Sequence, residues 1–233
     1  MSNKCLLIAD HKSVDKQIHI FNKNDFSYLT SIGNFGEGPE EITVMGCLAI
    51  DEAHHQLYVS DHAKQKIFSY DMDSVMVDSL YKPQVKTAMN ETLFPSEYQY
   101  INDTLSIAVL IKPTSTSTFN QFLGRWNMNT GEMIPMKYTH PDIQKKRITF
   151  AASEKAGIYV ECYTRHDLMT ICSLDGELLY NIYGPDWDGG NGNKLQSFGT
   201  VMIGNDKIFV SYCGEDYALS LIHISEPTRL GMI

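Results

Sequence analysis

Two histidines follow aspartates at matching places in the sequence, and they are the first candidates for chemistry. The segment Leu7–His11 corresponds to Tyr58–His62, and each is followed by a second β-rich run. Loop ends on a rigid scaffold are where binding sites are usually built. His11 and His62 could therefore belong to a ring of His and Asp side chains that holds a metal or a carbohydrate. Alternatively, each aspartate caps local N–H groups in a turn and each histidine is simply exposed.

A tryptophan between two carboxylates is the second candidate. Asp186, Trp187 and Asp188 precede a loop rich in Gly and Asn. An exposed Trp flanked by carboxylates suits stacking on a sugar ring. The alternative is a Trp that closes the seam between two packed sheets.

The sequence assigns no catalytic residue, no cofactor and no metal centre. No Ser/His/Asp or Cys/His set stands at a recognisable spacing, and scattered carboxylates define no acid/base pair. None of the five cysteines forms a CxxC pair, and metal-like spacing to histidines is absent. Four of them, Cys47, Cys162, Cys172 and Cys213, lie in or beside apolar strands. The simplest interpretation is that they pack there as small buried hydrophobic residues. The cysteines are Cys5, Cys47, Cys162, Cys172 and Cys213.

The elements that must position these residues repeat about every fifty positions. Equivalent apolar strands centre on Ile8, Val59, Ile107, Ile158 and Ile208, at spacings of 51, 48, 51 and 50 residues. A regular period of this length with several short strands per unit is typical of a β-propeller. We therefore predict an all-β fold, a β-propeller fragment with four to five four-stranded blades. The blade repeats are expected near 4–34, 44–82, 96–140, 147–184 and 197–217, with a strand over 75–81 in the second.

Composition excludes one class of partner. The chain has 233 residues and a formal net charge of −9, so it does not have the basic face that a general nucleic-acid binder needs. The short basic run Lys145–Arg147 is expected to be a solvated turn. No stretch approaches the roughly 20 apolar residues of a transmembrane helix. Met1–Lys4 leads into a strand without an export signal, so the chain taken literally is cytoplasmic.

The segment from Gly33 to Glu41, Gly-Asn-Phe-Gly-Glu-Gly-Pro-Glu-Glu, resembles the G-x-G-E-G-P-G-E segment of six-bladed β-propellers of the TolB-like and NHL-like kind. Its structural motif comprises Gly33, Gly36, Glu37, Gly38 and Pro39. We interpret it as a turn that joins blades, because a phosphate-binding loop needs a strand-to-helix context and a lysine. Glu40 stands where the pattern usually has Gly, which reaches positive φ far more readily.

The resemblance implies six blades, about 300 residues at this period, and an exported protein. Similar propellers are common among lipoproteins of Gram-negative gut anaerobes, which implies a periplasmic or outer-membrane location for the parent protein.

The C-terminus resembles something other than a protein family. Residues Leu219 to Arg229 look like the translation of a transposase adapter used to prepare sequencing libraries. We therefore expect residues 1–218 to be an incomplete propeller and 219–233 to be a non-native readthrough tail. The alternative is a real strand over 219–224. An incomplete ring would leave an open edge at 199–213, where self-association is expected.

Two functions follow from this interpretation. The first is a non-catalytic binding or scaffold module that presents loops to a glycan or protein. The second is a propeller enzyme, such as a polysaccharide lyase or a lactonase-like hydrolase, with a His/Asp site at the mouth of the channel. The first is preferred because no catalytic set is visible, and a fold alone does not imply a function.

Overall fold

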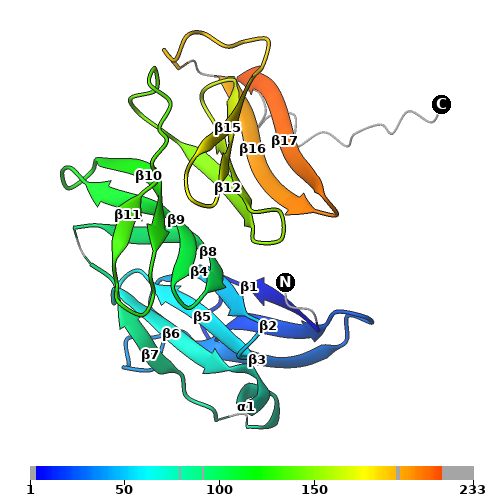
Figure 1. Cartoon of the computed structure of the whole chain (residues 1–233). Coiled ribbons are helices and arrows are strands. Elements are labelled where there is room, and N and C mark those ends of the chain that lie inside the picture. The colour runs from blue at the N-terminus through cyan, green and yellow to red at the C-terminus, as the bar shows by residue number, and fades with distance from the viewer. Residues whose placement is uncertain (1–3, 79, 91, 193–194, 217–233) are drawn as a thin grey trace. The chain divides into compact units, whose positions relative to one another are not determined.

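The chain folds into successive antiparallel sheets in the computed structural model, which describes residues 4–78, 80–90, 92–192 and 195–216 (Figure 1). Five sheets follow one another along the sequence, and three of them have four strands in simple chain order. The predicted all-β propeller fold is confirmed. Among the described residues, no helix has the length and apolarity that crossing a membrane would require.

The first two sheets cover the N-terminal third of the chain. The first has three strands: β1 (Cys5–Ala9), β2 (Lys16–Asn22) and β3 (Tyr28–Asn34). The second has four: β4 (Met45–Asp51), β5 (Gln56–Asp61), β6 (Lys66–Asp71) and β7 (Gln84–Ala88). A short helix, α1 (Met72–Val77), lies between β6 and β7 in the chain.

The remaining sheets repeat the same order. The third sheet contains β8 (Phe94–Asn102), β9 (Leu105–Pro113), β10 (Phe119–Trp126) and β11 (Met133–Pro135). The fourth contains β12 (Ile148–Ser153), β13 (Ile158–Tyr163), β14 (Leu168–Ser173) and β15 (Leu178–Tyr183). The fifth pairs β16 (Leu195–Gly204) with β17 (Lys207–Asp216).

The repeated strand occupies the same place in each complete sheet. The positions named from the repeat fall in β1, β5, β9, β13 and β17, and three of these are the second strands of four-stranded sheets. Val59 and Ile107 are fully buried there. The second strand is apolar because it lies inside its sheet and is covered on both faces.

The described residues divide into two compact units: 4–119 with 123–135, and 120–122 with 136–216. In the first unit, β4 contacts β8, and a core around Ile18, Leu57 and Phe68 joins the first two sheets. In the second unit, β12 contacts β16, and Val160 and Val201 belong to the core between their sheets.

The predicted strand over 75–81 is wrong, and the second blade extends past its expected end at 82. Helix α1 begins where Asp71 Oδ1 accepts the backbone N–H of Ser74 at 2.7 Å, which caps the helix. The fourth strand, β7, comes only after this helical turn. A local cap therefore outweighs the β propensity of Val75 and Val77.

The adapter-like segment 219–233 lies outside the described residues, so the expected division at 218 stays a prediction. Three large apolar side chains of the β16–β17 sheet are exposed, Met202, Phe209 and Tyr212. Self-association through this sheet also stays a prediction.

Candidate functional site

The outer strand β15 presents an unusual apolar surface. In the described part of the chain, β15 pairs only with β14, so its other edge is open. Five of its six side chains are large, apolar and 41–66% exposed: Leu178, Leu179, Tyr180, Ile182 and Tyr183. Exposed edges are usually protected by charge, proline or short length. The outer strand β7 carries Lys86, and the outer strand β11 has three residues and ends in Pro135. Strand β15 has no such protection, although its register with β14 shifts once, near Cys172.

The remaining residue of β15 fixes the strand in place. Thr170 Oγ1 donates to Asn181 Oδ1 at 2.8 Å, and Asn181 Nδ2 donates to the Tyr138 hydroxyl at 2.7 Å. Thr170 is fully buried. These bonds anchor β15 at Asn181, and its apolar side chains, which point to both faces of the strand, stay exposed.

Trp187 lies against the end of this strand. Its ring centroid is 5.0 Å from that of Tyr183 and 5.3 Å from that of His140. His140 Nε2 lies 3.0 Å from the Tyr183 hydroxyl. Trp187 is half-buried, so it is not a free stacking platform. It extends the β15 surface as part of an aromatic cluster within its own unit.

A buried carboxylate shapes the loop that carries Trp187. Asp167 is 1% exposed, and its Oδ2 accepts the Asp186 backbone N–H at 2.8 Å and the Tyr212 hydroxyl at 3.1 Å. A Cβ at Gly184 would overlap this carboxylate, which explains the glycine. The side chain of Asp186 is exposed, whereas Asp188 Oδ1 accepts the Gly190 N–H at 3.2 Å. Asp186 thus places a negative charge at the rim, and Asp188 stabilises the loop.

Two buried histidines lie near this loop. His140 is 3% exposed and His166 is 5% exposed. Burial lowers the pKa of His140, although nearby Asp142 opposes the shift. Burial also lowers the pKa of His166, against the opposing effects of a hydrogen bond to the Lys145 backbone and of the nearby Asp188 carboxylate. Both imidazoles are therefore more readily neutral in the folded protein than in the unfolded chain.

We expect the stability of the protein to fall as the pH falls below about 6.5, the histidine pKa of the unfolded chain. The unfolded state binds protons at His140 and His166 before the folded state does, so the free energy of unfolding rises with pH in this window. Each histidine contributes at most about 1.4 kcal/mol per pH unit. Urea midpoints at pH 5.5 and 7.5 measure the effect. His166→Gln should reduce the pH dependence, and His11→Gln, at an exposed turn, is the matched control. An unchanged slope in His166→Gln would contradict the assignment.

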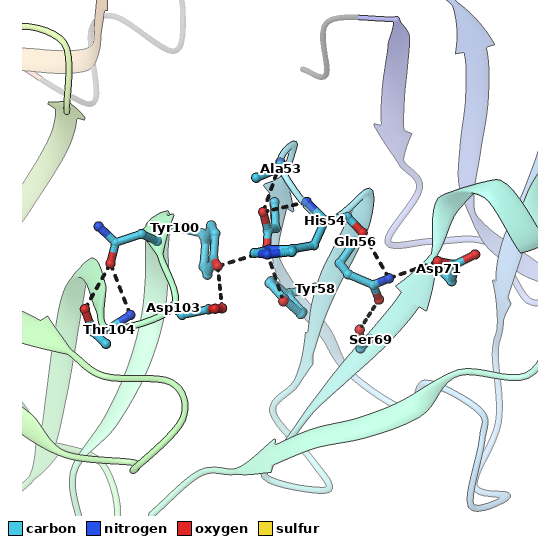
Figure 2. Close-up of polar contacts among 11 residues, drawn as sticks. Ala53, His54, Gln56, Tyr58, Ser69, Asp71, Tyr100, Asp103 and Thr104 are labelled. Carbon is cyan, nitrogen blue, oxygen red and sulfur yellow. Dashed lines mark hydrogen bonds and ion pairs between the residues drawn. The ribbon is translucent and has the colours of Figure 1, made fainter.

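A second polar cluster lies in the other unit, where the β4–β5 turn approaches the β8–β9 turn (Figure 2). Asp51 is 3% exposed; its Oδ1 accepts the N–H groups of Ala53 and His54 at 3.1 and 3.2 Å. Its Oδ2 lies 2.7 Å from His54 Nδ1 and accepts from the Tyr100 hydroxyl at 2.9 Å. The same hydroxyl lies 2.9 Å from Asp103 Oδ1.

The electrostatics of the cluster follow from these contacts. Burial would raise the pKa of Asp51, but hydrogen bonds from His54 and Tyr100 outweigh it and lower the pKa. The hydrogen bond to Asp51 raises the pKa of His54. Burial and the nearby carboxylates raise the pKa of Tyr58 to about 12 and raise that of Tyr100 further. The lowered pKa favours the anionic form of Asp51, and its hydrogen bond from Tyr100 connects the second sheet to the third.

The cluster is also the one group of described residues with converging metal-ligand atoms. One ligand atom from each of Asp51, His54 and Asp103 lies within 4.8 Å of the others. Sequence reasoning missed it, because Asp51 and Asp103 are distant in the chain. The available signal was the repeat itself, since the first hairpin turns of successive blades lie next to each other.

His11 and His62 occupy equivalent turns, β1–β2 and β5–β6, but their surroundings differ. His11 is exposed, and the carboxylate of the neighbouring Asp10 accepts the Lys12 N–H at 3.0 Å. His62 is half-buried, its ring centroid is 6.3 Å from that of Phe94, and burial lowers its pKa. A ligand role for His11, His62, Asp186, Trp187 and Asp188 stays a prediction.

The Gly33–Pro39 motif forms the connection between the first two sheets, as its interpretation as a turn requires. Two of its carbonyls and that of the following Glu41 surround an ammonium group: Lys64 Nζ donates to Gly36 O at 3.3 Å, Gly38 O at 2.7 Å and Glu41 O at 2.6 Å. Gly33 has a φ of +75°, which favours glycine. Glu40 is not among the described residues with positive φ, so its substitution for glycine strains nothing.

Comparison with solved structures finds several chains that this one resembles. A chain of a Bacteroides caccae protein of unknown function has a TM-score of 0.47 and 14% identity; the match covers 91% of this chain and 66% of that one. The WD40 β-propeller domain of Doa1 has a TM-score of 0.52 and 12% identity; the match covers 90% of this chain and 72% of that one. A chain of the nidogen/laminin complex has a TM-score of 0.54 and 9% identity; the match covers 88% of this chain and 70% of that one.

This chain thus spans just under two thirds of the Bacteroides caccae chain. No curated protein matches the sequence. The model of the family described as 6-bladed beta-propeller matches residues 1–118, half of the chain. The sheet order, the fifty-residue repeat and this match agree, and the chain belongs to the DUF5128 family of 6-bladed beta-propellers.

Proposed function

We propose that this protein is a non-catalytic binding module that recognises a protein partner through strand β15 and the adjoining Trp187. The observation that carries the proposal is the run of five exposed, large apolar side chains on an uncharged edge strand. Contiguous exposed apolar surface of this kind marks interaction sites in soluble proteins. Propellers commonly serve as rigid scaffolds, so a partner would meet a surface that is already ordered.

The chemistry of this surface suits a protein better than a glycan. Its centre is aliphatic and aromatic, and charge lies at the rim, where Lys137 Nζ and Glu177 Oε1 form an exposed ion pair at 2.6 Å. An apolar, aromatic centre inside a polar rim is the usual anatomy of a protein interface. The Tyr183 hydroxyl is already engaged by His140, so it is a poor donor to a sugar.

The open edge of β15 suggests how the partner binds. An extended segment could add to the sheet through main-chain hydrogen bonds, while alternate side chains contact Leu179 and Tyr183. One of the similar structures is a chain of a complex between two proteins, nidogen and laminin, which is consistent with a partner of this class.

The finer family assignment belongs to the same proposal. The Gly33–Glu41 segment and the repeat support placement among TolB-like and NHL-like propellers. That placement supports export, with the parent protein a lipoprotein of the periplasm or outer membrane.

The proposal is tested with the double variant Leu179→Lys/Ile182→Lys, which puts two charges on β15. Wild type and variant are used to capture partners from the native host, and the affinity of each purified partner is then measured. We expect the variant to weaken binding at least tenfold, the loss of about 1.4 kcal/mol that a typical interface anchor supplies.

Val85→Lys is the matched control, because Val85 is 50% exposed on the equivalent outer strand β7. Equal affinity of the wild type and the β15 variant would overturn the proposal. A glycan array signal that depends on Trp187, with no protein partner captured, would select a glycan ligand instead.

A further inference from the structure

We propose that Asp51, His54 and Asp103 form a binding site for a divalent transition-metal ion such as Zn²⁺. The site is separate from β15, belongs to the other compact unit and does not depend on the proposed function. It would connect the first hairpin turns of the second and third sheets, near the inner strands β4 and β8.

The three side chains converge as metal ligands do. One ligand atom of each lies within 4.8 Å of the other two, so small side-chain movements would bring all three to the bond lengths of about 2.0–2.2 Å that a Zn²⁺ ion requires. The side chain of Asp51 is almost fully buried, whereas that of His54 is 61% exposed. Asp51 would thus hold the ion from inside the protein, and solvent would reach the ion on the side of His54.

The phenol of Tyr100 shows why this position suits a cation. Its oxygen lies 2.9 Å from Asp51 Oδ2 and 2.9 Å from Asp103 Oδ1, but it carries one proton. Only one carboxylate can accept that proton at a time, and the other faces an oxygen lone pair. A cation bound between the carboxylates would satisfy both.

The supporting contacts hold the anchor ligand in place. Asp51 Oδ1 is occupied by the N–H groups of Ala53 and His54, which leaves Oδ2 as the ligand atom. Such fixed outer contacts orient metal ligands and raise their affinity. Asp103 lies in the two-residue turn between β8 and β9, so its backbone position is also restricted.

The donor set selects the class of ion. An imidazole nitrogen with two carboxylates suits Zn²⁺ and its neighbours, whereas Ca²⁺ takes six to eight oxygen ligands. Three protein ligands leave at least one position for water or a ligand group. The other charged group near His54 is Lys86, whose ammonium lies over the Tyr58 ring, 5.6 Å from its centroid, and has the smallest of the effects that act on the pKa of His54.

The test is titration of the metal-free full chain with Zn²⁺ alone, by calorimetry or against a chromophoric chelator. We expect one site in the wild type and at least a tenfold loss of affinity in Asp103→Asn and in His54→Gln. Asp103 is exposed and Asp51 stays intact in both variants, so the fold should persist. Thermal melts of the metal-free proteins check this.

The residue next to His54 supplies a matched control. His55 Nδ1 lies 2.8 Å from Asp73 Oδ2, both are exposed, and this pair offers one carboxylate instead of two. His55→Gln should bind Zn²⁺ like the wild type. Unchanged affinity in Asp103→Asn, or an equal loss in His55→Gln, would overturn the proposal. Co²⁺ substitution gives an independent readout: a thiolate charge-transfer band would place the metal on a cysteine and also overturn it.

Discussion

Replacing Lys146 with methionine is expected to lower the free energy of unfolding by about 3–5 kcal/mol. Lys146 Nζ lies 3.1 Å from Glu161 Oε1, and the two side chains are only 6% and 2% exposed. The ammonium also lies 5.5 Å from the Tyr163 ring centroid. Removing it leaves the Glu161 carboxylate buried with no compensating cation, which costs far more than the loss of an exposed ion pair. Urea denaturation of the full chain measures the difference.

The same pair permits a sharper test. The Tyr163 hydroxyl donates to Glu161 Oε2 at 3.0 Å, so an apolar replacement must remove this donor too. The triple variant Lys146→Met, Glu161→Leu, Tyr163→Phe should recover most of the lost stability, because well-packed apolar groups often equal or exceed a buried ion pair.

Lys155→Met is the control for the pair. Its ion pair with Asp206 spans 3.4 Å, and both side chains are more than 80% exposed. We expect a change within about 1 kcal/mol there. A loss in Lys146→Met no larger than in Lys155→Met would show that the buried pair does not stabilise the fold.

The repeat could be predicted from the sequence because it depends on local residue types. Strands such as β5 and β13 combine β-branched and aromatic residues between turn residues, so their type and order followed from the pattern. Helix α1 did not follow from the pattern, because it depends on one side-chain cap at Asp71. The basic run 145–147 was expected to be solvated; the structure keeps Lys145 and Arg147 exposed but buries Lys146.

The polar sites were less predictable for a related reason. Lys146 is buried because it meets Glu161 across fifteen residues, and Asp51 is ordered by Tyr100 across forty-nine. Such partners are set by how neighbouring strands and sheets pack, which a single sequence does not display. Trp187 was recognised from its neighbours in sequence, but its contact with Tyr183 and His140 was not.

The aspartates that precede His11 and His62 should respond very differently to mutation, although they are equivalent in the repeat. Asp61 is fully buried, and its carboxylate accepts four backbone N–H groups at 2.8–3.2 Å, from Thr43, Val44, Ala63 and Lys64. It therefore connects the β5–β6 turn to the chain that enters the second sheet. Asp10 is exposed and accepts the N–H of Lys12.

We expect Asp61→Ala to lower the free energy of unfolding by at least about 3 kcal/mol, because each buried N–H left without a partner costs about 1–3 kcal/mol. Lys64, whose Nζ lies 3.8 Å from Asp61 Oδ2, would lose its nearest carboxylate as well. Asp10→Ala should change stability by no more than about 0.5 kcal/mol, as exposed substitutions usually do. Matched urea titrations of the two variants measure both values. Similar losses in the two would mean that the repeat position, and not the buried hydrogen bonds of Asp61, determines the effect.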